Sequence, residues 1–310
     1  MGMDSSAIID WLRDGDVSVR YQTERDLLGH DEPVLAARIA TEGWGARFLA
    51  AQNEDGNWGG GFYRTKWISS HYTLLDLKLI GLPGDNPVAR NAVAKILREE
   101  HGADGSLGPG WTIPPDVCIH GMFLDYACHF GAPEADLRRI IDYVLTQQMG
   151  DGGFNCRRPR GAHHSSMHST LSVLEGILSY RQNGYRYRLA ELEAVAAGGR
   201  EFLLMHRLFR SDHTGEIIRE DFLKFAFPPR WKYNILRALD YFWRADCPLD
   251  PRTTEAIDVV LQKRRSDGRW NVPSPHSGKL HFEMEKAGQP SRWNTLIALR
   301  VLGKYRPETA

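Results

Sequence analysis

A turn built on Asp-Gly recurs along the 310-residue chain and constrains its fold more than any other feature. Its five copies carry glycine at positions 56, 105, 152, 215 and 268, between 47 and 63 residues apart, and aspartate directly precedes the glycine in all but the fourth, which reads Asp212-His213-Thr214-Gly215. Glycine tolerates the positive φ with which a helix commonly stops. A unit repeated at such a period is typical of helical solenoids and rings.

Each turn lies between two helical stretches. Residues 32–51, 88–100 and 135–148 come before turns, and the last of these carries apolar residues at helical spacing. After each turn a Pro/Gly-rich loop leads to a second helix, and four second helices align on an acidic residue: Asp76, Asp125, Glu175 and Asp240. No strand pattern recurs. The chain is therefore predicted to be all-α, with about five to six helical hairpins in a single domain over residues 1–310, as a solenoid or a closed ring.

Composition excludes several classes of protein. Lys plus Arg and Asp plus Glu both total 39, so no excess positive charge would hold a nucleic acid. No apolar run approaches the roughly 20 residues that span a bilayer. The first residues are polar and acidic, unlike a signal peptide. Four irregularly spaced cysteines are too few for a disulfide framework, which favours a reducing, cytoplasmic location.

The first turn suggests a family. Its Gln52, Gly56 and Trp58 resemble the glutamine–tryptophan repeats of squalene and oxidosqualene cyclases and of protein prenyltransferase β subunits, and residues 16–28 and 43–47 resemble bacterial members of that superfamily. The resemblance implies an (α/α) toroid whose inner helices point their N-termini at a central, aromatic-lined cavity. The Asp-x-Asp-Asp acid of the class II cyclases is absent from this sequence.

The resemblance to the prenyltransferases also implies a zinc site. Those β subunits bind zinc through an Asp-x-Cys pair at the start of one inner helix and a histidine at the start of the next. Asp116, Cys118 and His168 match that pattern in type, order and register. Three such ligands suit Zn²⁺ and leave a fourth position open for chemistry. Each residue also has a structural interpretation, as a helix N-cap, a small buried residue and a hydrogen-bonded histidine.

Substrate contacts are predicted in several repeats. Residues 108–113 contain no Lys or Arg, so the diphosphate clamp of the prenyltransferases is not reproduced. Tryptophans in the register of Asp116 and nearby arginines are the candidates for substrate binding: Trp67, Arg158, Arg160, Arg230, Trp231 and Trp293. The arginines of the loop at 157–160 could hold a diphosphate. For the repeated Arg-Trp pairs at 230–231 and 292–293, helix capping and core packing are at least as good an explanation as ligand binding.

Two neighbouring histidines, His163 and His164, are candidate general bases or additional metal ligands, because imidazole titrates near neutrality. His71 and His120 share one register position and are assigned to packing. The remaining cysteines, Cys128, Cys156 and Cys247, are interpreted as structural.

These features lead to three functional hypotheses. The first is a zinc-dependent enzyme that transfers a prenyl or alkyl group from a hydrophobic, isoprenoid-like molecule to a zinc-activated nucleophile, or a hydrolase or lyase if the zinc binds water. The second is a metal-free enzyme resembling the terpene cyclases, in which aromatic rings stabilise a carbocation. The third is a non-catalytic ring that binds a lipid or a protein partner. The prenyltransferases also need a separate α subunit, which leaves a protein partner open.

Overall fold

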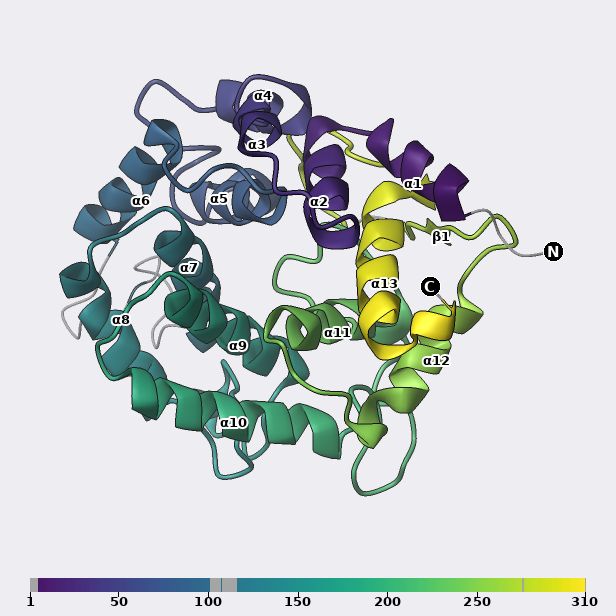
Figure 1. The fold of residues 1–310 in the computed structure, drawn as a ribbon. Helices are drawn as coiled ribbons and strands as arrows, with labels where there is room; N and C mark the ends of the chain where they lie inside the picture. The colour runs from purple at the N-terminus through teal and green to yellow at the C-terminus, as the bar shows by residue number, and fades with distance from the viewer. Residues whose placement is uncertain (1–4, 101–106, 108–115, 275, 310) are drawn as a thin grey trace. The chain divides into compact units, whose positions relative to one another are not determined.

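The computed structural model describes residues 5–100, 107, 116–274 and 276–309 (Figure 1). These residues form mainly α-helices, together with two antiparallel strands of two residues each, β1 (Trp270–Asn271) and β2 (Pro290–Ser291). The all-α prediction is confirmed. Within the described residues, no helix combines the length and the apolar character needed to cross a membrane.

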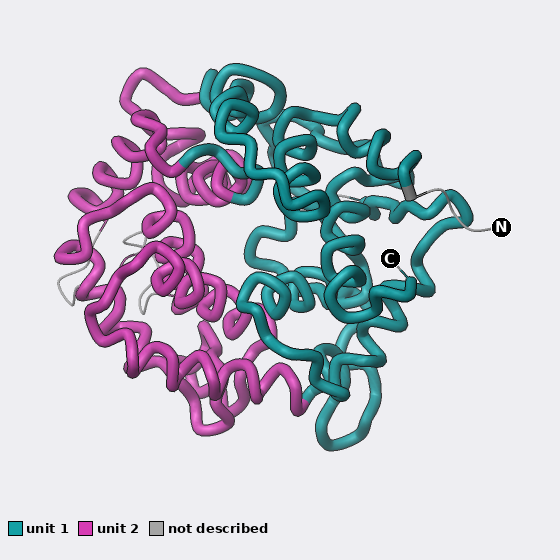
Figure 2. The backbone as a smooth tube through the Cα atoms, viewed as in Figure 1, with its two compact units in different colours: residues 1–51, 79–83, 206–310 teal, residues 52–78, 84–205 magenta. Residues whose placement is uncertain are grey.

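The chain divides into two compact units (Figure 2). Unit 1 comprises residues 1–51, 79–83 and 206–310, and unit 2 comprises residues 52–78 and 84–205. The chain enters unit 2 at the first Asp-Gly turn and leaves it after residue 205. The prediction of a single domain stays a prediction.

Unit 2 is a set of helical hairpins. Its helices are η1 (Lys66–Ile68), α5 (Ser70–Leu79, whose last residue belongs to unit 1), α6 (Pro87–Glu99), α7 (Val117–His129), α8 (Glu134–Thr146), η2 (Arg158–Arg160), α9 (Met167–Gln182) and α10 (Leu189–Met205). Helices α6 and α8 each bury one apolar stripe, whereas α5, α7 and α9 bury residues around most of their circumference. A helix that is covered on all sides lies inside the unit, so α5, α7 and α9 are inner helices of unit 2.

Two glycines bring α7 and α9 into unusually close contact. A Cβ at Gly121 of α7 would lie 2.5 Å from the carbonyl oxygen of Ser172, and a Cβ at Gly176 of α9 would lie 2.3 Å from the carbonyl oxygen of Gly121. No larger residue fits without moving one backbone away from the other. The two helices therefore touch through their main chains, which fixes how their first turns lie side by side.

Unit 1 contains both ends of the described chain. Its elements are α1 (Ser5–Arg13), α2 (Val17–Leu27), α3 (Pro33–Arg38), α4 (Gly43–Ala50), η3 (Glu220–Leu223), α11 (Ile235–Arg244), η4 (Pro251–Thr253), α12 (Thr254–Gln262), β1, β2, α13 (Arg292–Tyr305) and η5 (Pro307–Thr309). Helix α13 packs against α2 and α11 and is buried on nearly every side. Helix α11 is buried in the same way, so α11 and α13 are inner helices of this unit.

The predicted helix 32–51 is broken into α3 and α4. Gly43 adopts a φ of +59°, and Asp16 accepts a hydrogen bond from the backbone N–H of Trp44 at 2.8 Å. The carboxylate of Asp16 thus satisfies an amide that would otherwise lack a partner at the start of α4. An interaction with a residue 28 positions earlier ends one helix and starts the next.

The predicted turn geometry is confirmed where the chain is described. Gly56, Gly152, Gly215 and Gly268 have φ between +72° and +88°, whereas Gly105 lies outside the described residues. In two copies a glutamine amide closes the turn by donating to the glycine carbonyl at 2.9 Å, from Gln52 to Gly56 and from Gln148 to Gly152. This explains why glutamine stands four residues before the glycine in both copies.

The residue two positions after each of four glycines is tied to the following helix. Its backbone N–H donates to a side chain in the first or second turn of that helix: Trp58 to Ser70 Oγ (3.0 Å), Leu107 to His120 Nε2 (2.8 Å), Phe154 to Thr170 Oγ1 (2.9 Å) and Trp270 to Thr295 Oγ1 (3.1 Å). Since these buried amides need partners, the turn fixes the position of the next helix.

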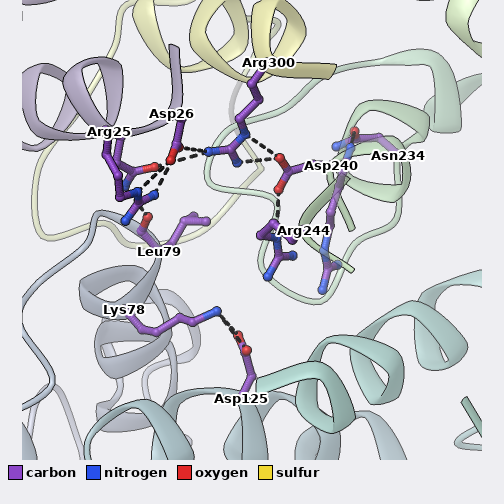
Figure 3. A network of polar contacts seen from close by, with 11 residues as sticks. Arg25, Asp26, Lys78, Leu79, Asp125, Asn234, Asp240, Arg244 and Arg300 are labelled. Carbon is purple, nitrogen blue, oxygen red and sulfur yellow. Dashed lines mark hydrogen bonds and ion pairs between the residues drawn. The ribbon is translucent and has the colours of Figure 1, made fainter. Parts of the chain in front are cut away.

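Two acidic residues of the repeat register form buried ion pairs (Figure 3). In unit 2, Asp125 accepts from Lys78 Nζ at 2.8 Å. In unit 1, Asp240 pairs with Arg300, and Arg300 also contacts Asp26 at 2.7 Å. Side chains of the unit 1 network are at most 8% exposed. The register position therefore holds inner helices together by charge, within each unit separately.

Candidate functional site in unit 2

Asp116 lies at the N-cap of α7, as predicted, but it does not cap the helix. Its backbone has φ −74° and ψ 121°, the extended conformation of an N-cap, and its side chain makes no capping hydrogen bond. One carboxylate oxygen instead faces Arg160, with Nη1 at 3.7 Å. Burial raises the pKa of Asp116, while Arg160 and Lys66 act to lower it. The carboxylate of Asp116 therefore interacts with Arg160 and does not cap α7.

His120 fixes the backbone on which Asp116 stands. Its Nε2 accepts from the N–H of Leu107 at 2.8 Å, so Nδ1 carries the proton and donates to the carbonyl of Asp116 at 3.0 Å. His120 and His71 are both fully buried, in keeping with the packing role predicted for them. Because both ring nitrogens of His120 are engaged, this residue positions the start of α7 and has no nitrogen left for a ligand.

The thiol of Cys118 lies against the thiol of Cys156. The backbone N–H of Cys118, in the first turn of α7, points at Cys156 Sγ with N···S at 3.4 Å. Ser169 Oγ, in the first turn of α9, lies 3.3 Å from the same sulfur. The two thiols also hydrogen-bond to each other. Cys156 therefore occupies the joint N-terminal end of α7 and α9.

The hydrogen bonds polarise the two thiols in opposite directions. The bond from Cys118 is the main cause that lowers the pKa of Cys156, against burial and the charge of Asp116. The same bond, together with burial, raises the pKa of Cys118. A helix N-terminus stabilises negative charge in its first turn and favours the thiolate in the same sense. Of the two cysteines, Cys156 is therefore the one whose thiolate form the site favours.

The start of α9 is open like that of α7, which means that no side chain of the N-cap residue caps the helix. Its N-cap residue, Ser166, makes no side-chain capping hydrogen bond. His168 is the second residue of α9 and is half-buried, and its carbonyl accepts from Ser172 Oγ at 3.0 Å. Neither α7 nor α9 is therefore capped by the side chain of its N-cap residue.

Aromatic side chains accompany this site. Tyr63 is half-buried, and burial raises the pKa of its hydroxyl, with smaller contributions in the same direction from Cys118, Asp116 and Cys156. The Tyr63 hydroxyl lies 2.9 Å from that of Tyr72, and the ring of Trp67 packs edge-on against Tyr72 with centroids 4.9 Å apart. Trp67, a predicted substrate contact, is 4% exposed and belongs to this aromatic group as a packed residue.

The loop before α9 carries several predicted residues on the surface. His163 and His164 are exposed, and the carbonyl of His164 accepts from Asn155 at 2.7 Å. Arg158 is also exposed and reaches Gln147 at 3.4 Å. Arg160 alone of this group reaches the thiol site, through Asp116.

The remaining predicted substrate contacts belong to unit 1. Arg230 is 6% exposed and has a φ of +54°, and Trp231 is half-buried. Trp293 is 1% exposed and stacks on Phe227, with centroids 4.8 Å apart and an interplanar angle of 15°. These side chains favour the core-packing interpretation over that of a binding surface.

The structure therefore gathers part of the predicted site. It places Asp116, Cys118 and Arg160 together, and it adds Cys156 and Ser169. Within the ranges that the structure describes, no three His, Cys, Asp or Glu residues form a ready-made group that could hold a metal ion. The zinc site stays a prediction.

Cys156 is the residue that sequence reasoning missed. It lies four residues after Gly152 of the third turn, where no local sequence pattern indicates a function for a cysteine. The sequence alone therefore favours a structural role for it. One signal was present: Cys156 precedes the His-rich segment that leads into the helix of His168, and Cys118 opens the preceding inner helix. Only the contact between α7 and α9 makes these two positions neighbours.

Comparisons with known proteins add no assignment to this geometry. Neither the models of known protein families nor the curated protein sequences yielded a match to the chain.

Proposed function

We propose that this chain is a zinc-dependent enzyme that acts on a hydrophobic, isoprenoid-like small molecule and transfers a prenyl or alkyl group to a zinc-activated nucleophile. The proposal includes the closed (α/α) toroid as the arrangement of its hairpins. The observation that supports it most is the start of α7, where the side chain of Asp116 makes no capping hydrogen bond and Cys118 lies beside Cys156.

The chemistry of the donors suits this metal. Thiolate, carboxylate and imidazole are the side chains that bind Zn²⁺ in proteins, and a site with an open position is the catalytic kind. The residues that would hold the ion are Asp116, Cys118 and His168, at the first turns of α7 and α9. When bound, zinc would lower the pKa of a thiol or water molecule in its open position.

The surrounding side chains suit an apolar substrate with a charged end. Half-buried Tyr63 is the member of the aromatic group that could face a substrate, with Trp67 and Tyr72 packed behind it, and aromatic faces stabilise a carbon centre that gains positive charge. Lys66 and Arg160 bring positive charge next to Asp116 and could attract an anionic leaving group. Transfer of an alkyl group needs both kinds of surface around the nucleophile.

The direct test is metal analysis of the purified protein. We expect one zinc per chain in the unmodified protein, a loss of most of it in Cys118→Ser and His168→Ala, and no loss in Cys247→Ser, whose thiol lies in unit 1. Metal-free unmodified protein that is folded by circular dichroism would contradict the proposal. Metal-free protein that converts an isoprenoid substrate would instead support the cyclase-like alternative, for which the aromatic group is the favouring observation.

A further inference from the structure

We infer that Cys156 is a second sulfur ligand of the metal ion proposed to bind Cys118. The inference rests on the proposed function for the presence of a metal, but it concerns a residue that the resemblance to the prenyltransferases does not imply. It assigns two of four coordination positions to Cys118 and Cys156. The other two are left to Asp116, His168, water or substrate.

The contact between the two cysteines supports this assignment. The backbone N–H of Cys118 lies 3.4 Å from Cys156 Sγ, and the two thiol side chains interact with each other. Two thiolates that bind one zinc at about 2.3 Å in tetrahedral geometry stand about 3.8 Å apart, so the ligands of one ion must be neighbours of this kind.

The partners of Cys156 are those of a metal-bound thiolate. Sulfur ligands of metals generally accept hydrogen bonds that orient them and balance their charge. Cys156 Sγ has the backbone N–H of Cys118 at 3.4 Å and Ser169 Oγ at 3.3 Å. Both groups come from first turns of inner helices, whose positions the contact at Gly121 and Gly176 makes rigid. Such a preformed arrangement lowers the conformational cost of binding an ion.

A divalent cation would balance the negative charges of the Cys118 and Cys156 thiolates and of Asp116. Two thiolates and the Asp116 carboxylate would carry three negative charges when a metal displaces the protons, and Arg160 lies 3.7 Å from one oxygen of that carboxylate. A divalent ion removes the repulsion between the sulfurs. Thiolate ligands select zinc over magnesium or calcium, which prefer oxygen.

The other cysteines provide matched controls. Cys128 lies in α7 itself and is 1% exposed, so it shares the helix of half-buried Cys118 but not its position at the helix start. Cys247 lies in unit 1 and is half-buried. If sulfur alone determined metal binding, substitution of these residues would reduce it as well.

Cobalt substitution tests the inference by a signal that counts sulfur ligands. Metal-free protein is titrated with Co²⁺, and the near-ultraviolet charge-transfer absorption from sulfur to cobalt is recorded for unmodified protein and for Cys118→Ser, Cys156→Ser, Cys128→Ser and Cys247→Ser. We expect Cys118→Ser and Cys156→Ser each to lose about half of the absorption per bound cobalt, or to lose binding altogether. Cys128→Ser and Cys247→Ser are expected to keep the full signal.

The outcomes separate this inference from the proposed function. If unmodified protein binds cobalt and Cys156→Ser retains the full charge-transfer absorption, Cys156 is not a ligand while the metal site stands. If folded, unmodified protein binds neither cobalt nor zinc, the metal site itself is refuted, and the inference falls with it. Circular dichroism of each variant shows that a lost signal does not come from unfolding.

Discussion

The inner helices of the two units begin in different ways. In unit 1, the N-cap residues Asn234 of α11 and Ser291 of α13 each accept a hydrogen bond from a backbone amide of the first turn at 2.9 Å. In unit 2, the N-cap residues Asp116 of α7 and Ser166 of α9 make no such bond. The same position in the repeat is closed in one unit and open in the other.

The capped helix starts of unit 1 stabilise the fold, whereas the uncapped helix starts of unit 2 carry the side chains of the proposed site. At the start of α13, Glu285 accepts from the backbone N–H groups of Arg292 and Trp293, so the exposed amides of the helix end are satisfied within the unit. At the start of α7, the amide of Cys118 instead points at the sulfur of Cys156. Since helix N-termini bind anions, the open starts of unit 2 are where the proposed function would place a charged nucleophile or a metal-bound thiolate.

Titratable side chains follow the same division. The first turns of α5, α7 and α9 contain His71, His120 and His168, whereas those of α11 and α13 contain no histidine. Burial lowers the pKa of His71 to about 3, with a smaller contribution from His120. The start of α5 should therefore respond to pH.

The largest expected effect is an acid-dependent loss of stability through His71. The unfolded chain binds a proton at this histidine below its ordinary pKa of about 6.5, but the folded chain does so only near pH 3. Stability is thus unaffected above pH 6.5 and is lost as pH falls from 6.5 towards 3, by on the order of 5 kcal/mol. Urea unfolding at several pH values should show a flatter acid limb for His71→Gln than for the unmodified protein.

His163 provides the control for this effect, because it is exposed. His163→Gln should reproduce the acid limb of the unmodified protein. Parallel pH profiles for His71→Gln and the unmodified protein would show that His71 is protonated in the folded state, against the assignment.

The next largest effect is expected at the closed start of α13. Trp293→Ala removes a fully buried ring that stacks on Phe227 and should cost about 4 kcal/mol in the free energy of unfolding. Because Trp293 is a packing residue in unit 1, the metal content of the folded fraction should not change. Denaturant unfolding and metal analysis on the same sample give both values, and a loss of metal without a loss of stability would restore Trp293 as a ligand-binding residue.

A smaller pair of effects compares the two kinds of helix start directly. Ser291→Ala deletes a capping bond and should cost about 1 kcal/mol. Asp116→Ala deletes no capping bond, only an ion pair with half-exposed Arg160, and should cost less than about 0.5 kcal/mol in metal-free protein. Thermal unfolding of the two variants in chelator measures the contrast, and equal costs would mean that Asp116 stabilises the helix after all.

The parts of this fold that depend on neighbouring residues could be predicted from the sequence. The glycine of each turn and the glutamine four residues before it act within one turn, so their spacing is visible in the chain, as Gln52 and Gly56 illustrate. The N-cap position of Asp116 follows from local sequence in the same way. No local pattern shows that Trp67 and Trp293 pack in the core, and this assignment needs the structure.

The parts that depend on distant residues could not be predicted. The break before α4 requires Asp16 to reach Trp44, and nothing local to residues 32–51 announces it. The contact of Cys118 with Cys156 joins residues 38 positions apart and requires the close approach of α7 and α9 at Gly121. A repeat register aligns equivalent positions, but Cys156 lies in a loop outside that register. The repeat register therefore indicates the residues at the helix starts and gives no signal for Cys156.

The central claim is that the open helix starts of unit 2 form one metal-binding site around Cys118 and Cys156. Its most direct measurement is the rate at which a small alkylating agent modifies each cysteine in folded, metal-free protein with and without added zinc, followed by peptide mass spectrometry. The account predicts that zinc slows the modification of Cys118 and Cys156 together, at one equivalent per chain, and leaves Cys247 unchanged. Modification of Cys118 and Cys156 at the same rates with and without zinc would contradict it.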